Sequence, residues 1–262
     1  MKKIILTTII VILTTVISAH EYILLAESFF LERGQTLELH LFVADGFNVE
    51  AERVYQKSMT KGFILFTEDG QKDLKKSSEQ GDIPILEMKV DFEGLGLITM
   101  ERNYAQISLP TDRFKSYVKG DNIENVVVDE SKPEQKEKYL RFIKTLVQSN
   151  PKKGDDLYSK KVGHQFEIVL LQNPYELTSE DWISAQVFFN GRPLANKAIT
   201  ARNRTGNEPA TYQYSRTDQD GVCSFKLERG GEWFIHATHM IPNSEGDTDW
   251  ISFWTSYSFG MK

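Results

Sequence analysis

The stretch "QTLELHLFV", residues 35–43, decides the fold class because apolar side chains occupy every second position along it. The apolar positions on one side are Leu37, Leu39, Leu41 and Val43. Successive side chains of a strand point to opposite faces of a sheet, so this spacing predicts a strand with one buried face. The stretch therefore favours a β protein over a helical one.

The same pattern continues on both sides of this stretch. Turn-forming pairs and glycines separate the apolar runs, at Gly34, Asp45-Gly46, Asp69-Gly70 and Gly94. The runs "GFILFTEDGQ" and "GLGLITMERN" have the composition of further strands. We therefore expect an antiparallel N-terminal β domain over residues 20–110.

The middle of the chain has a different periodicity. In "SKPEQKEKYLRFIKTLVQSN", residues 131–150, apolar side chains recur at helical spacing, at Tyr139, Leu140, Ile143, Leu146 and Val147. Ser131 stands where a helix cap is expected, and Pro133 falls near the first turn. The pattern predicts a helix here and a shorter one within "FKSYVKGDNIENVV", residues 114–127. We assign residues 111–161 to a helical insertion or linker.

Strand signals return after Val162. Four segments carry them, namely "VGHQFEIVLL", "WISAQVFFNGRPLANKAITARN", "YQYSRTDQDGVCSFKLERGGEWFIHATHM" and "WISFWTSYSF". Turns are expected at Asn190-Gly191, Asp220-Gly221 and Gly230-Gly231. Short strands with this spacing favour a sandwich over residues 162–262. The predicted fold is mainly β, with two antiparallel β-sandwich domains of the Ig or transthyretin-like kind and a short α-helical insertion between them.

The first nineteen residues have the organisation of a secretory signal peptide. Lys2 and Lys3 precede an apolar run from Ile4 to Ile17, and Ser18-Ala19 provides small residues for cleavage. The apolar run is shorter than the roughly 20 residues that a membrane-spanning helix needs. We expect residues 1–19 to be removed and the rest to be a periplasmic or secreted protein without a membrane span.

Composition narrows the classes of function. The net charge is −6 and basic residues form no cluster, so nucleic acid is not an expected partner. Cys223 is the only cysteine, which rules out an internal disulfide. The chain has no Gly-x-Ser-x-Gly nucleophile elbow and no phosphate-binding glycine loop. These observations favour a binding protein over an enzyme.

Cleavage after Ala19 would place His20 at the start of the mature chain. A terminal histidine offers its α-amine and its imidazole, which together form a chelate ring around a metal ion. Imidazole suits Ni, Co, Cu and Zn. The alternative is that His20 follows the cleavage site by chance.

Two further histidines in "EWFIHATHMI" could complete such a site. His236 and His239 are three residues apart, so on a strand they point to opposite faces. His239 shares its face with Trp233, Ile235 and Ala237, which are apolar. We interpret His239 as the candidate ligand at the rim of the core, and His236 as a hydrogen-bonded structural residue.

Three other side chains are weaker candidates. His40 alternates with polar residues on the exposed face of its strand. Asp247 and Asp249 follow His239 closely, and either carboxylate could bind a metal directly or orient a ligating histidine. Acidic residues in such a loop are also common as merely solvated groups.

Several motifs occur in a fixed order along the chain. They are "AHEYIL", "LFVADGF", Tyr139-x-Arg141-x-x-Lys144, "NPY", "GRPL", "TDQDG", "GGEWFIHATHM" and "DWISFW". The series resembles the exported NikM-like family, a domain of unknown function often labelled a nickel-uptake or nickel/cobalt-transport component. The C-terminal part, from "VFFNGRPL" to "HATHM", is similar to the transthyretin-like or carboxypeptidase-regulatory-like sandwich.

The resemblance implies a periplasmic β-rich protein linked to transition-metal handling. The family's leading His-Glu pair falls on His20 and Glu21, and its His-Met pair on His239 and Met240. Its acid-Trp motif begins at Asp249. The family start "EFWLEP" is "EYILLAES" here, without the Trp and Pro.

The leading hypothesis is a soluble periplasmic protein that binds a divalent transition metal, nickel or cobalt before copper or zinc, for uptake or delivery. His20 and His239 would be the main ligands, helped by Asp247 or Asp249, and a membrane metal transporter is the expected partner. One alternative is a metal-free β-sandwich interaction module. Another is a copper-dependent oxidative enzyme with a histidine-brace site.

Overall fold

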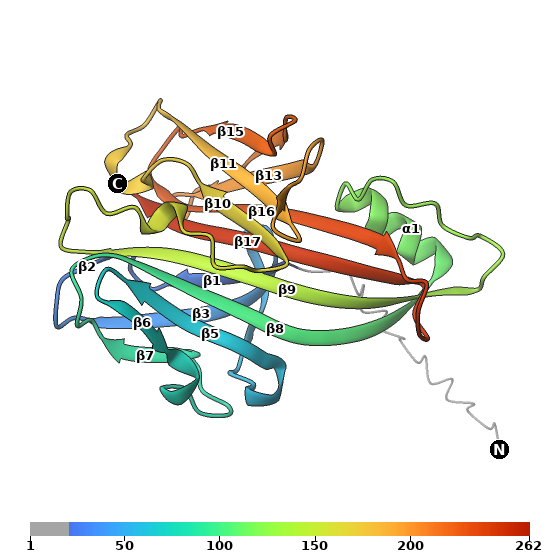
Figure 1. Ribbon diagram of the computed structural model, residues 1–262, viewed down its shortest axis with the longest axis horizontal. Helices are drawn as coiled ribbons and strands as arrows, with labels where there is room; N and C mark the ends of the chain where they lie inside the picture. Colours follow the sequence, from blue (N-terminus) through green and yellow to red (C-terminus); the bar gives the residue numbers. More distant parts are fainter. Residues whose placement is uncertain (1–20) are drawn as a thin grey trace, which may run out of the picture.

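Three stacked β-sheets make up the body of the protein in the computed structural model (Figure 1). The structure describes residues 21–262. The expected signal peptide, residues 1–19, and His20 lie outside the described residues. The described part contains seventeen strands and one α-helix, which confirms the predicted mainly β class. No helix in residues 21–262 has the length and apolar character needed to cross a membrane.

The outer sheet that we call sheet A is formed early in the chain. Its strands are β1 (Glu21–Ala26), β3 (Thr36–Asp45), β4 (Asn48–Arg53) and β7 (Leu86–Lys89). The stretch "QTLELHLFV" lies almost entirely in β3, and its leucines Leu37, Leu39 and Leu41 are fully buried. The period-two prediction for this segment is confirmed.

The middle sheet, sheet B, has nine strands from all parts of the chain. Its order is β14 (Thr211–Arg216), β13 (Ala198–Arg204), β16 (Gly231–Pro242), β17 (Trp250–Met261), β9 (Glu134–Ser149), β8 (Gly94–Pro110), β5 (Thr60–Thr67) and β6 (Gly70–Asp73), with β2 (Phe30–Leu31) paired to β9. β17 and β2 both pair with β9 in parallel, so sheet B is not purely antiparallel.

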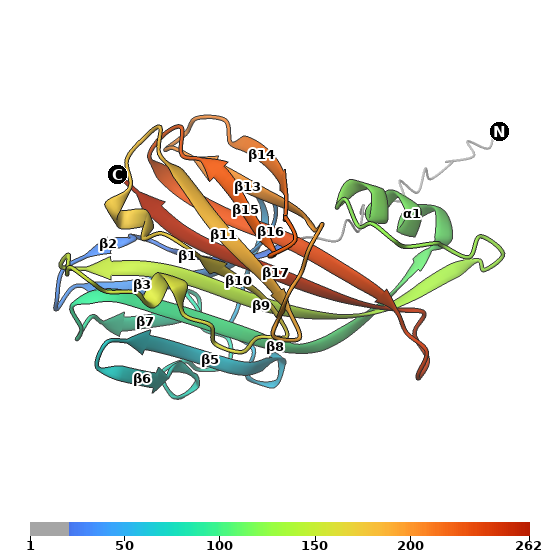
Figure 2. The ribbon, with the colours of Figure 1, turned by 45° about the horizontal axis from the view of Figure 1, so that its top comes forward.

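Sheet C covers the other face of sheet B. It contains β10 (Phe166–Leu170), β11 (Trp182–Phe189), β12 (Arg192–Pro193) and β15 (Val222–Lys226). Four single-turn 3₁₀ helices lie between strands, at Lys57–Met59, Leu74–Lys76, Leu157–Ser159 and Pro174–Glu176. Figure 2 shows the long strands of sheet B running between the two smaller sheets.

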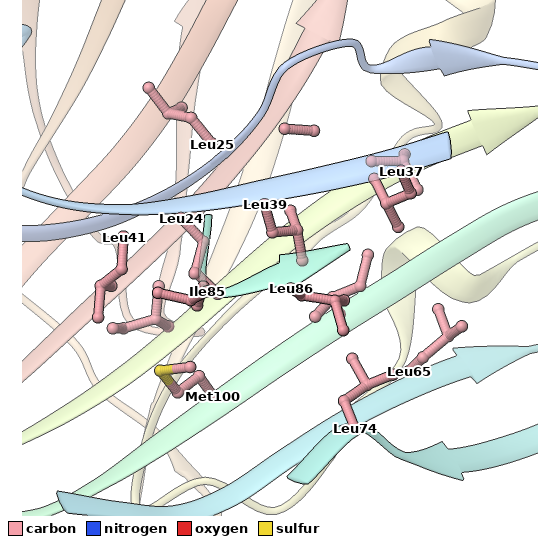
Figure 3. Close-up of a cluster of buried hydrophobic side chains, with 14 of the residues drawn as sticks. Leu24, Leu25, Leu37, Leu39, Leu41, Leu65, Leu74, Ile85, Leu86 and Met100 are labelled. Atoms are coloured by element: carbon pink, nitrogen blue, oxygen red, sulfur yellow. The ribbon is translucent and has the colours of Figure 1, made fainter. Parts of the chain in front are cut away.

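Each outer sheet buries its own apolar cluster against sheet B. The cluster under sheet A includes the leucines of β1 and β3 together with Met100 of β8 and Phe234 of β16 (Figure 3). The cluster under sheet C includes Phe166, Ile183 and Trp233. Sheet B is therefore buried on both faces, which makes it the structural centre of the molecule.

The helix α1 (Thr111–Gly120) lies at one end of the long strands (Figure 1). Phe114 stacks on Trp250 with ring centroids 5.9 Å apart, and Tyr117 stacks on Trp254 at 6.0 Å. Trp254 pairs with Thr238 across β16 and β17, on the face of sheet B that sheet A also covers. α1 and sheet A therefore share one face of sheet B.

The predicted helix over residues 131–150 is wrong, because Glu134–Ser149 forms strand β9. From Phe142 onward every residue of β9 is buried. Ile143 and Val147 pack under sheet A, while Phe142 and Leu146 pack under sheet C. A strand covered on both faces places apolar residues at adjacent positions, as at Phe142-Ile143 and Leu146-Val147, and such pairs four residues apart also match helical spacing.

The predicted insertion at residues 111–161 is only partly helical. Its first part contains α1, which overlaps the shorter of the two predicted helices. Its second part is β9, which joins β8 on one side and β17 on the other. One continuous sheet therefore contains strands from both expected domains, 20–110 and 162–262.

Candidate functional site

A row of side chains crosses sheet B where β1 begins. Backbone register aligns Tyr214, Thr200, His236 and Ser256 across β14, β13, β16 and β17. β1 lies over this face, and the Ser256 hydroxyl donates a 2.9 Å hydrogen bond to the Tyr22 carbonyl. This contact places the first described residue, Glu21, next to His236.

Glu21 is buried, and donors occupy both of its carboxylate oxygens. Its Oε1 lies 3.0 Å from His236 Nδ1, and its Oε2 accepts from Arg202 Nη1 at 2.8 Å and from the Gly46 amide at 3.3 Å. Burial alone would raise the pKa of Glu21, but His236, Arg202 and the Gly46 amide together hold that pKa below its usual value. Glu21 is thus an ionised carboxylate inside the protein.

The contact with Glu21 determines the state of the His236 ring. An ionised carboxylate can only accept a hydrogen bond, so Nδ1 of His236 must carry the proton. The other nitrogen, Nε2, carries the lone pair whenever the ring is neutral, and it lies 3.4 Å from Thr238 Oγ1. Metal-binding histidines are commonly oriented in this way, with one nitrogen hydrogen-bonded to a carboxylate and the other on the metal.

Asp121 reaches the same place from the end of α1, where its amide donates to the Tyr117 carbonyl at 3.0 Å. It lines one small cavity with His236, Thr238 and Tyr214. Its Oδ2 is buried and has no hydrogen-bond partner among residues 21–262. Burial, followed by repulsion from the Glu21 carboxylate, raises the pKa of Asp121 to about 8, although Arg202 opposes the shift.

Arg202 supplies the positive charge of this group. Its guanidinium also lies 3.7 Å from Asp45 Oδ1 and 4.9 Å from the centre of the Tyr212 ring. We call Glu21, Asp121, Arg202 and His236 the N-terminal pocket. The pocket combines one imidazole, one paired carboxylate and one carboxyl oxygen that has no hydrogen-bond partner among residues 21–262.

Aromatic rings and a second guanidinium border the other side of His236. A second small cavity is lined by Tyr22, Arg141, His236 and Trp254. Arg141 Cζ lies 3.9 Å from the centre of the Tyr22 ring, and the His236 and Trp254 rings are 5.7 Å apart. These large side chains limit access to His236 from this direction.

His239 lies on the opposite face of β16, as the odd spacing from His236 predicts. Its ring packs under sheet C, 4.5 Å from the Phe189 ring and 6.5 Å from the Phe253 ring. Burial, and secondarily Lys197, lowers the pKa of His239 to about 4. Sheet B therefore separates His239 from Glu21 and His236.

The weaker candidates also lie away from the pocket. His40 pairs with Leu25 of β1, four residues or about 13 Å along the strand from Glu21, and its Nδ1 is 2.6 Å from Glu52 Oε1. Asp249 binds Lys132 and accepts from the Lys136 amide at 2.8 Å, while Asp247 is exposed. Asp249 immediately precedes Trp250, six residues or about 20 Å along β17 from Ser256.

Within residues 21–262, no three His, Cys, Asp or Glu side chains are grouped so that they could hold a metal ion. His20, the main sequence-predicted ligand, lies outside this part of the chain. The described residues therefore supply an oriented imidazole and a carboxylate, but not a full set of ligands.

Sequence reasoning missed three members of the N-terminal pocket. His236 was interpreted as structural because nothing nearby in the sequence pairs with it, whereas its partner Glu21 is 215 positions away. Asp121 directly follows α1 and Arg202 lies in β13, and neither belongs to a sequence motif. The one usable signal was the period-two pattern, which separates His236 from the apolar face of β16.

The fold and pocket define a protein of stacked β-sheets with a buried histidine–carboxylate site at the start of its first strand. The chain belongs to the family described as "Domain of unknown function (DUF4198)", whose model matches residues 17–241. No curated protein matches the chain.

Two solved structures show distant similarity to the chain. The D0-D1 domain of Intimin is 10% identical, with 91% of this chain and 97% of that one covered and a TM-score of 0.22. A membrane anchored protein from Corynebacterium diphtheriae is 11% identical, with 93% of this chain and 60% of that one covered and a TM-score of 0.21. TM-scores this low carry no information about function.

Proposed function

We propose that the mature chain binds a divalent transition metal ion at the N-terminal pocket, nickel or cobalt before copper or zinc. The ligands would be the α-amine and imidazole of His20 together with Nε2 of His236. An exported protein with such a site would capture the ion or hand it to a membrane transporter. The 3.0 Å contact between Glu21 and His236 carries the proposal.

This contact supports the proposal in two ways. It places a proton on Nδ1, so Nε2 is the nitrogen of the neutral ring that a metal would bind. It also fixes Glu21, and consecutive Cα atoms are about 3.8 Å apart, so the proposal requires the residue before Glu21 to reach His236 across a single peptide unit. If cleavage follows Ala19, that residue is the chain-terminal histidine.

The proposal uses His236 in place of His239 as the second ligand. His239 lies under sheet C, on the face of β16 that points away from Glu21. A metal–nitrogen bond is only about 2.0–2.1 Å long, so one ion cannot bind nitrogens from both faces of a sheet. Asp249 lies about 20 Å along β17 from Ser256, and Asp247 precedes it by two residues, so neither enters the proposed site.

The test uses protein whose first residue has been shown by mass spectrometry to be His20. Ni²⁺, Co²⁺, Cu²⁺ or Zn²⁺ should raise its melting temperature, because a ligand at 100 times its Kd stabilises the folded state by about 2.7 kcal/mol. Chains with an alanine before His20, and His236→Ala, should lose the shift. The matched variant His239→Ala should keep it.

Two results would overturn the proposal. The first is that none of the four ions stabilises correctly processed protein. The second is that the alanine-extended chain is stabilised as much as the processed one. Binding of copper alone, with turnover of peroxide or oxygen, would instead favour an oxidative enzyme.

A second prediction concerns Glu21, which orients His236 without contacting the metal. Glu21→Gln keeps the shape but removes the charge that holds the proton on Nδ1 of His236, so we expect metal affinity to fall about 10- to 100-fold. Titration calorimetry measures the change. Glu27→Gln, on an exposed carboxylate just after β1, is the control and should bind normally. Equal metal affinity in Glu21→Gln and Glu27→Gln would show that Glu21 does not orient His236 for metal binding.

A further inference from the structure

The two carboxylates of the N-terminal pocket are in different states. Glu21 uses both oxygens, which receive contacts from His236, Arg202 and the Gly46 amide. Asp121 has a buried Oδ2 without any partner in the described chain. A buried polar atom without a hydrogen bond destabilises the protein, and native structures show few of them. Asp121 is therefore the carboxylate with a free coordination position.

Asp121 also lies in the right place to share a ligand with His236. Both residues line one cavity. The other polar residues that line it include Thr200, Thr238 and Tyr214. Asp121 is held there from the α1 side, because its amide bonds to Tyr117 and Tyr117 stacks on Trp254. The position of this carboxylate is thus fixed by a packed helix and not by a mobile loop.

We infer that Asp121 supplies an oxygen ligand to the metal ion, completing a set with His236 and His20. This inference rests on the proposed function and adds the fourth donor. Three nitrogens and one carboxylate oxygen suit a divalent ion such as Ni²⁺, Co²⁺ or Zn²⁺. A carboxylate is a poor ligand for monovalent copper, which prefers sulfur donors. The proposed donor set therefore favours divalent ions.

The experiment is calorimetric titration of Ni²⁺ and Co²⁺ into three proteins that begin at His20. They are the unmodified chain, Asp121→Asn, and the control Asp45→Asn, whose carboxylate is exposed and 3.7 Å from Arg202. Asp121→Asn should weaken binding at least tenfold, and Asp45→Asn should not. Circular dichroism of the metal-free variants establishes that they are folded, and Asp121→Ser provides a second replacement.

The outcomes separate the inference from the proposed function. If Asp121→Asn and Asp121→Ser bind as tightly as the unmodified chain, while His236→Ala does not, Asp121 is not a ligand and the proposed function stands. If the unmodified chain binds neither Ni²⁺ nor Co²⁺, the inference and the proposed function are both wrong. Selective loss of affinity in the Asp121 variants supports the inference.

Discussion

Replacing Lys144 by methionine is expected to lower the free energy of unfolding by about 3–5 kcal/mol. Lys144 lies in β9, and its side chain is 1% exposed. Nζ is 2.6 Å from Glu167 Oε1 and donates to the Ile168 carbonyl at 3.0 Å. Burial lowers the pKa of Lys144 to about 8, against the opposing influence of Glu167. The pair therefore joins the middle sheet to sheet C.

The expected loss of stability is large because the substitution leaves the buried Glu167 carboxylate without Lys144. Glu167 would keep its bonds from the Val162 and Gly163 amides, at 2.7 and 3.1 Å, but lose its only buried counter-charge among the described contacts. Removing one partner of a buried pair is far more costly than removing both.

Urea unfolding followed by tryptophan fluorescence measures the change. Lys61→Met is the control, because Lys61 pairs with Glu101 at the surface and such pairs contribute little. The double variant Lys144→Met, Glu167→Leu should recover much of the loss. A single variant as stable as the control would contradict this account of the pair.

Asp121→Asn is expected to make the metal-free protein more stable at pH 9 and to flatten its pH dependence. The pKa of Asp121 is about 8 in the folded protein and near 3.8 when the chain is unfolded. Between these values the folded state holds a proton that the unfolded state has released, so stability falls as pH rises from about 4 to 8. Asparagine has no such proton, and its amide does not ionise in the pocket.

Each unit of pKa shift corresponds to about 1.4 kcal/mol, so the difference between variant and unmodified chain should reach the order of a few kcal/mol above pH 8. It should become small towards pH 4, where the folded-state aspartate is protonated and the unfolded-state aspartate is about half protonated. Urea unfolding in the presence of a chelator, at pH 4, 6, 8 and 9, measures it. Parallel pH profiles for the two proteins would show that Asp121 ionises normally. Asp247→Asn, which replaces an exposed carboxylate, should leave the profile unchanged.

Much of the fold follows from local patterns. The alternation in residues 35–43 predicts β3, because one face of that strand is buried and the other is partly exposed. The same rule fails for β9, whose two faces are both covered after Phe142. Whether a strand is covered once or twice depends on which sheets stack on it, and that is set by segments distant in sequence. The helical spacing of residues 139–147 therefore does not correspond to a helix, because these residues lie in β9.

The candidate site, too, depends on contacts between distant segments that local sequence patterns do not predict. The alternation of β16 correctly places His236 and His239 on opposite faces, but it does not say which face meets the start of the chain. That choice depends on β1 lying over β17, through Ser256 and the Tyr22 carbonyl. The pairing of Glu21 with His236 and Arg202 arises from this arrangement. Asp121 enters only because α1 ends beside it.

The most direct test of the account is an NMR titration of ¹⁵N-labelled protein that begins at His20. Substoichiometric Co²⁺ is paramagnetic and broadens or shifts the signals of nuclei near its site. The account predicts that the amide signals of Tyr22, Asn122 and Ala237, next to the pocket residues, broaden first, while those of His40 and Asp247 stay sharp. Broadening centred on the loop at Asp247, or no broadening at all, would contradict it.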